Sequence, residues 1–497
     1  MNPLAPVTLQ PLRESREFLQ LADALKTREH TLGAYGLIDS QKPHFAAALQ
    51  HHQGGQLLLL TETETQARQL AEDLNFYLGK NTQFFPARQP VLYDAIASDV
   101  STGMERLKTL QFLSQQKPAV ITAPMEALFM KLPPPELFRR LRLTFTLGET
   151  VRREDMLRTF MEQGYQRAEQ VEEKGRYSIR GDIIDIFPPT EESPLRIELF
   201  DDEVDSIRRF DLLTQQSIEK IASVTIYPAT EWILDDAGRA RVIDTLQRMK
   251  AQAADPLSTF DNSCGSEDRC SQLIGRLTDT QNPHDLEGLQ DLAYAPAASL
   301  LDYLAPESLV LLDEPQRLRH RSEGVTDEWR EHFTLLLERR QALPVQAHCL
   351  FTPPEITARI KAKTVITLHL LPRNEKEFPA QTVVNFVTRS VPSFQGKMNW
   401  LFDELRGFAR KQYRIVLLAA GKEKALKLLD ALREAGVPVQ YLVEQPQSQQ
   451  EGYSGDGGNV TQGSQVPPSP SNLPSFPDQS QVPPSPSNLP SFPDQSQ

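Results

Sequence analysis

The chain has 497 residues, 39% of them hydrophobic and 24% charged, with a formal net charge of −13. This length allows about three domains with proper cores, and the acidic balance argues against a protein that coats nucleic acid over its whole surface. It has no apolar run long enough to span a membrane, no secretory pattern at its start and no zinc-like cysteine spacing, so we expect a cytoplasmic protein without membrane contact.

Residues 1–148 alternate between apolar strands and amphipathic helices. The stretch "GQLLLLTETETQARQLAEDLNFYL" predicts a buried strand and a helix, and "PAVITAPMEALFMKL" repeats this plan. Strands that are apolar throughout, with helices between them, indicate a parallel sheet covered on both faces. We therefore predict the first part of an α/β domain over 1–148.

Residues 149–232 have a different pattern. After a short helix, "RYSIRG", "DIIDIFP", "LRIELF", "VDSIRRFD" and "ASVTIYP" alternate with period two and are separated by turn residues. This is typical of an antiparallel sheet with one wet face. We interpret the segment as an α+β insert.

The rest of the chain divides into three further segments. Residues 233–345 are mainly helical and reach an apolar strand in "ESLVLLDEP", which indicates a return to the interrupted α/β domain. In residues 346–445 the stretch "YRIVLLAAGKEKALKLLDALREAGVPVQYLV" indicates a strand, a helix and another strand, which predicts a small α/β domain. It is relatively basic, and a solvated face explains this better than contact with DNA. At 446–497 a repeated Pro/Ser-rich stretch predicts a disordered tail.

A sequence near the N-terminus, "GAYGLIDSQKPHFAAAL", has the outline of a phosphate-binding loop. A working loop needs two glycines, a lysine and a Ser or Thr at fixed spacing. Here Gly36 and Lys42 match, whereas Gln41 replaces the second glycine and Pro43 replaces the hydroxyl residue that would hold magnesium. Because Pro43 also removes a backbone donor, we expect a non-functional loop, or an ordinary connection between a strand and a helix.

A second nucleotide-related signal is the pair Asp313 and Glu314 at the end of a predicted strand. Such a pair coordinates magnesium in nucleotide hydrolases. Without a working phosphate loop we favour an acidic pair that ends a strand. We therefore expect no catalytic residue, metal or cofactor in this chain.

The insert carries a long and specific resemblance. Its runs "IRGDIIDIFP", "RIELFDDEVDSIRRFD" and "TIYPATEW" resemble, in this order, the insert domain shared by the excision-repair protein UvrB and the transcription-repair coupling factors (Mfd). The stretches "PVLYDAIASD", "ITAPMEALFMKLPPPE", "ASLLDYLAPESLVLLDE" and "VPSFQGKMNWLFDEL" favour the coupling factors. So do Gln41 and Pro43, because the loop is intact in UvrB and degenerate in the coupling factors. The resemblance covers residues from about 10 to 445 and implies a UvrB-like α/β domain.

The resemblance implies that the insert binds the repair protein UvrA through Arg180, Arg196 and Phe200. Alternation along "LRIELF" agrees, because it places Arg196 and Phe200 on the face opposite to the apolar residues. An aromatic residue beside an arginine is frequent at binding hot spots. The alternative is that Phe200 packs under the acidic turn at 201–203 and that the arginines pair with Asp201, Asp202 or Glu203.

The resemblance therefore predicts a binding module that recruits UvrA to stalled RNA polymerase. Full-length relatives are expected to add an RNA polymerase-binding domain and a double-stranded DNA translocase that uses ATP and magnesium, so we expect this chain to be truncated before them. Two alternatives stay open. One is a UvrB-like ATPase that verifies DNA damage, and the other is a truncated gene product without a role of its own.

Overall fold

The computed structural model of the chain describes residues 5–27, 29–90, 92, 100–253, 266–279, 287–373, 375–394, 396–417, 419 and 421–441. The predicted disordered tail at 446–497 lies outside these residues. Within the described part, no helix combines the length and the apolar character that crossing a membrane requires.

Seven parallel strands form the first sheet, and they come from both sides of the insert. Their spatial order is β15 (Thr382–Asn385), β1 (Thr31–Tyr35), β14 (Thr364–His369), β13 (Leu309–Asp313), β2 (Gln56–Thr61), β4 (Ala119–Pro124) and β3 (Thr82–Phe84). Because β13 pairs directly with β2, the strands before and after the insert form one continuous sheet, and the domain that contains it is discontinuous in sequence. The predicted α/β class with a large parallel sheet is confirmed.

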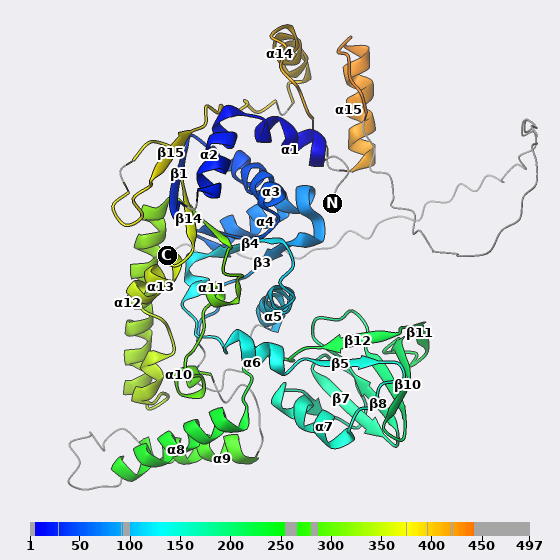
Figure 1. Ribbon diagram of the computed structural model, residues 1–497, viewed down its shortest axis with the longest axis vertical. Coiled ribbons are helices and arrows are strands. Elements are labelled where there is room, and N and C mark those ends of the chain that lie inside the picture. The colour runs from blue at the N-terminus through cyan, green and yellow to red at the C-terminus, as the bar shows by residue number, and fades with distance from the viewer. Residues whose placement is uncertain are drawn as a thin grey trace, which may run out of the picture. The chain divides into compact units, whose positions relative to one another are not determined.

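Helices cover both faces of this sheet (Figure 1). One face packs against α1 (Ala5–Arg13), α2 (Arg16–Lys26), α3 (Lys42–Gln53) and α4 (Glu64–Leu78). The other packs against α5 (Val100–Ser114), α6 (Pro135–Arg140), α11 (Leu300–Tyr303), α12 (Pro315–Glu338) and α13 (Pro353–Lys361). Short 3-10 helices lie at η1 (Asp39–Gln41), η2 (Gly79–Asn81), η3 (Met125–Leu128) and η6 (Pro344–His348).

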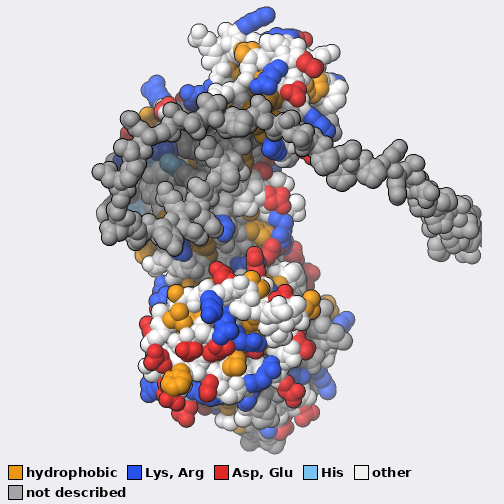
Figure 2. All heavy atoms as spheres, turned by 90° about the vertical axis from the view of Figure 1, so that its right-hand side faces the viewer, with side chains coloured by type: hydrophobic (Ala, Val, Ile, Leu, Met, Phe, Trp, Pro, Cys, Tyr) orange, Lys and Arg blue, Asp and Glu red, His pale blue; other side chains and the backbone are white. Residues whose placement is uncertain are grey.

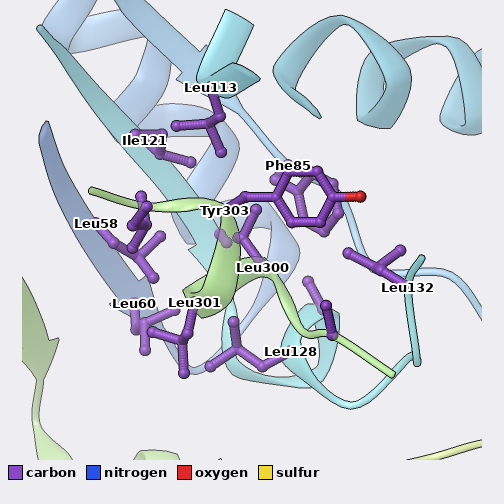
Figure 3. Packing of buried hydrophobic residues seen from close by; sticks show 14 of the residues in the cluster. Leu58, Leu60, Phe85, Leu113, Ile121, Leu128, Leu132, Leu300, Leu301 and Tyr303 are labelled. Atoms are coloured by element: carbon purple, nitrogen blue, oxygen red, sulfur yellow. The ribbon is translucent and has the colours of Figure 1, made fainter. Parts of the chain in front are cut away.

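Strand β2 is apolar at successive positions because both of its faces are buried. Leu57 and Leu59 belong to the core on one face, and Leu58 and Leu60 belong to the core on the other. Figure 3 shows Leu58 and Leu60 among the side chains of the second core. Each buried leucine contributes roughly 1.5–3 kcal/mol, so this strand is stable only with helices on both sides.

The insert contains a second sheet of six strands. Their order is β11 (Ser217–Lys220), β10 (Glu203–Phe210), β9 (Leu195–Phe200), β8 (Ile183–Ile186), β7 (Arg176–Arg180) and β6 (Gln166–Arg167). Strands β7 to β11 are antiparallel, as their alternation predicts, and only β6 pairs in parallel. Helix α7 (Arg153–Glu162) packs on one face through Met156 and Phe160, which leaves the other face wet.

The two ends of the insert lie on neighbouring strands. Strand β12 (Ser223–Ile226), which lies within the predicted strand "ASVTIYP", pairs with β5 (Leu143–Thr146) instead of joining the six-stranded sheet. The residues that follow are anchored firmly: Tyr165 Oη donates to the carbonyl of Tyr227 at 2.9 Å, and Arg106 Nε donates to both carboxylate oxygens of Glu231. The motif "TIYPATEW" therefore holds the insert to the first domain.

The segment after the insert begins with helices. α8 (Asp236–Ala253) and α9 (Ser266–Asp279) share a hydrophobic cluster with α10 (Gln290–Ala293). The largest side chain of that cluster is Trp232, which is almost completely buried. Figure 1 shows α8 and α9 lying side by side.

The structure corrects the predicted small α/β domain at 346–445. Strands β14 and β15 from this segment flank β1 in the first sheet, so the boundary at 346 cuts through that sheet. What stands apart is α14 (Met398–Arg410) and α15 (Lys422–Glu434), which share a small core. The expected strands around α15 are absent from the described residues 413–417 and 437–441. An apolar run becomes a strand only where a neighbouring strand pairs with its backbone.

Candidate functional site

The wet face of the insert sheet brings the three predicted partner-binding residues together. In the strand register Arg180 lies opposite Ile183, and Ile183 lies opposite Glu198. Because side chains alternate along a strand, Glu198 shares its face with Arg196 and Phe200. Arg180, Arg196 and Phe200 therefore project from one face, which we call the insert face.

Phe200 is the most exposed of these three residues. Its relative exposure is 75%, whereas Leu195, Ile197 and Leu199 on the opposite face are buried. Phe200 therefore does not pack under the turn at 201–203, and that part of the alternative interpretation is wrong. In Figure 2 the side of the insert that faces the viewer is a mixed surface, with Lys and Arg side chains among Asp and Glu and a few separate hydrophobic side chains.

Arg196 is held in one position by its neighbours. Its Nε donates to Asp185 Oδ1 at 2.7 Å and its Nη2 donates to Asp185 Oδ2 at 2.9 Å. The guanidinium also lies 4.6 Å from the centre of the Phe210 ring, a cation–π contact. The hydrogen bonds that Arg196 donates to Asp185 raise the pKa of Arg196 and outweigh the effect of its partial burial. The arginine is thus held in one orientation, and its side chain is 24% exposed.

The acidic partner of the arginines is not the one that the alternative interpretation named. Arg196 pairs with Asp185, and Arg180 reaches the same carboxylate at 4.0 Å; neither pairs with the turn at 201–203. Asp185 is almost fully buried, with 3% exposure. Sequence reasoning missed it, although its position between Ile184 and Ile186 in "DIIDIF" placed it on the wet face by alternation.

The loop after β1 has a structural use for its glycine. Gly36 has φ +79°, and a Cβ atom there would lie 2.0 Å from the carbonyl oxygen of Phe386. Thr388 Oγ1 also donates to the carbonyl of Gly36. The glycine therefore allows a close approach between two segments of the chain. Gln41 ends the 3-10 helix η1, and Pro43 lies in the first turn of α3.

Lys42 forms ion pairs with two carboxylates at the edge of the sheet where the strands end. Its Nζ lies 2.7 Å from Asp313 and 2.6 Å from Asp39. Burial lowers the pKa of Lys42, but the attraction of Asp313 and Asp39 exceeds that effect, so the pKa is raised and the ammonium stays charged. For Asp313, burial raises the pKa and the adjacent ammonium opposes the rise. An incoming phosphate would have to compete with carboxylates already paired with this lysine.

Glu314 and His369 complete this edge. Glu314 has an unusual φ of +51°, and its Oε1 accepts a hydrogen bond from the backbone N–H of Leu370 at 2.8 Å. The buried ring of His369 stacks on the ring of Tyr35, with 5.0 Å between the ring centres. His369 Nδ1 lies 3.9 Å from Glu314 Oε2. Burial lowers the pKa of His369. Glu314 thus joins two strand ends, and the described residues include no group of three His, Cys, Asp or Glu side chains that could hold a metal ion.

The insert belongs to a known class of domain. Residues 143–232 match the family model described as the UvrB interaction domain. This range starts at β5 and ends after β12, so it contains the whole insert sheet together with its two connecting strands.

Over most of its length the chain is similar to transcription-repair-coupling factors. It is 30% identical to that of Bacillus subtilis (strain 168) over 426 residues, which are 85% of this chain and 36% of the relative. The factor of Staphylococcus haemolyticus is 26% identical over 440 residues, or 88% of this chain and 37% of the relative. The chain spans little more than a third of these curated relatives. The predicted resemblance to their N-terminal UvrB-like region is confirmed.

Proposed function

We propose that this chain is a partner-binding module of transcription-coupled DNA repair, in which the insert face binds UvrA. The observation that carries this proposal is the exposed Phe200 beside the preorganised Arg196, on a sheet within the matched UvrB interaction domain. Exposed aromatic and arginine side chains are the groups that most often dominate binding energy. The module would recruit UvrA, in the cytoplasm, to RNA polymerase that has stalled.

We further propose that the first domain is a scaffold without nucleotide chemistry. Lys42 is paired with Asp313 and Asp39, and Gln41 and Pro43 remove the glycine and the hydroxyl that a phosphate loop needs. ATP, magnesium, RNA polymerase and double-stranded DNA belong, in this proposal, to the parts of full-length relatives that this chain does not match.

Titration of the full chain with purified UvrA tests the insert face. We expect Phe200→Ala and Arg180→Ala each to weaken binding by about tenfold or more, because each removes an exposed hot-spot group. Leu335→Ala is the matched control, since Leu335 is 48% exposed on α12, outside the insert. Arg196→Glu is a less clean change, because it also places a carboxylate beside buried Asp185. Unchanged affinity in both the Phe200 and Arg180 variants would show that this face does not bind UvrA.

The competing function is a UvrB-like ATPase that verifies damage. Equilibrium titration with a fluorescent ATP analogue separates the two, because the scaffold proposal expects no magnesium-dependent binding. The third possibility, a gene product without a role, is tested by expression in cells that lack the native factor. An effect on repair or on UvrA localisation that depends on Phe200 would exclude it.

A further inference from the structure

The loop between β10 and β11, residues 211–216, carries a leucine to which the proposed function assigns no role. Leu213 has a relative exposure of 93%, the highest among the exposed large hydrophobic residues of the described chain. An isolated exposed leucine is common and carries no argument alone. What distinguishes Leu213 is how the loop holds it and where the loop lies.

The loop is fixed by hydrogen bonds to one aspartate. Asp211 Oδ1 accepts from the backbone N–H of Leu213 at 3.1 Å, from that of Thr214 at 2.7 Å and from Thr214 Oγ1 at 2.9 Å. The backbone N–H of Gln215 also donates to the carbonyl of Asp211 at 2.8 Å. Hydrogen bonds from Thr214 lower the pKa of Asp211, as expected for a carboxylate that is bonded in its charged form. Leu213 is therefore presented to solvent by a loop that loses little conformational freedom on binding.

The same loop contacts the insert face directly. Arg196 Nη2 donates to Gln215 Oε1 at 3.1 Å, and Gln215 Nε2 donates back to the carbonyl of Leu212 at 2.9 Å. Arg196 thus lies between the loop on one side and the end of β9, with Phe200, on the other. Phe200 lies four positions further along the extended strand than Arg196, which is about 13 Å.

We propose that Leu213 is a second apolar anchor for the partner of the insert face, on the side of Arg196 opposite to Phe200. This inference rests on the proposed function. It specifies the partner surface as an acidic region that faces Arg180 and Arg196, flanked by two apolar depressions. The hydrogen bond that joins the loop to Arg196, within the matched UvrB interaction domain, favours UvrA over a second copy of this chain as the occupant.

The test uses the full chain and purified UvrA. Leu213→Ala is expected to weaken binding by about tenfold and to leave the salt dependence unchanged, because no charge is removed. Arg180→Ala should instead weaken the salt dependence. Leu335→Ala again serves as the control for loss of an exposed leucine. Since Leu213 is almost fully exposed, the unfolding transition of Leu213→Ala should match that of the wild type.

Asp211→Ala provides a second, independent variant. It should weaken binding in the wild-type background by loosening the loop, and have a much smaller effect when Leu213 is already alanine. If Leu213→Ala binds normally while Phe200→Ala does not, the second anchor is refuted and the proposed function stands. If Phe200→Ala and Arg180→Ala also bind normally, both proposals fail. Loss of self-association in sedimentation, without loss of UvrA binding, would assign Leu213 to a contact between copies and overturn the inference.

Discussion

The buried pair of Lys42 and Asp313 gives the sharpest prediction about the first domain. Lys42→Met leaves the Asp313 carboxylate, whose side chain is 10% exposed, without its cation. Removing one member of a buried pair costs about 3–5 kcal/mol, because the remaining charge is uncompensated. Asp313→Asn should cost less, because Asp39 still neutralises Lys42. The double variant Lys42→Met with Asp313→Leu should recover most of the loss, since both charges are then gone.

Urea unfolding gives the overall stability, and amide hydrogen exchange in β13 and β14 gives the local free energy of opening. The pH dependence of the stability loss shows whether its cause is electrostatic. In Lys42→Met the pKa of Asp313 should rise further, because the ammonium that opposed the effect of burial is absent. A carboxyl whose pKa is raised in the folded state binds more protons when folded than when unfolded. The stability that Lys42→Met loses relative to the wild type should therefore become smaller as the pH falls from 7 towards 4. If this loss of stability does not depend on pH, the electrostatic explanation is refuted and only lost packing remains as its cause.

Three further predictions concern the same edge of the sheet. Gly36→Ala should destabilise the protein by about 1–3 kcal/mol more than Gly54→Ala, as measured by thermal unfolding. Both glycines have positive φ, but only at Gly36 would the new Cβ meet a backbone oxygen at 2.0 Å, so equal losses would contradict this. Reverting Gln41→Gly together with Pro43→Thr should not restore binding of a fluorescent ATP analogue, because the loop lysine stays paired; recovered affinity would show that the two substitutions alone disable the loop. Burial lowers the pKa of His369, so the unfolded chain binds more protons and stability should fall below about pH 6.5; His369→Phe should flatten this slope, and an unchanged slope would assign it to other groups.

The features that follow from side-chain periodicity could be predicted from the sequence. Apolar runs such as 57–60 indicated a sheet covered on both faces, and the alternation along 195–200 separated a core face from a wet one. Partners that lie far apart in the chain could not be predicted in this way. The pairing of Lys42 with Asp313 depends on the order of the strands in the sheet, which local patterns do not encode.

The error at residue 346 has the same origin. Strand β14 lies between β1 and β13, and its pairing with β1 joins residues more than 300 positions apart in the chain. At 413–417 the local preference was for a strand, and the described residues offer no neighbouring strand there. Leu213 was not singled out because exposure in a turn leaves no periodic signal.

The pairing of β5 with β12 has a consequence for how the insert could be exchanged between proteins. Chain entry and chain exit lie on adjacent antiparallel strands, with Leu143 opposite Ile226 and Thr146 opposite Ser223. A host domain therefore has to provide two neighbouring attachment points for β5 and β12, together with a partner for a residue that follows β12, as Arg106 provides for Glu231 here. Such a segment is portable: it can be transplanted between scaffolds with different chemistry while the surface that it carries is preserved.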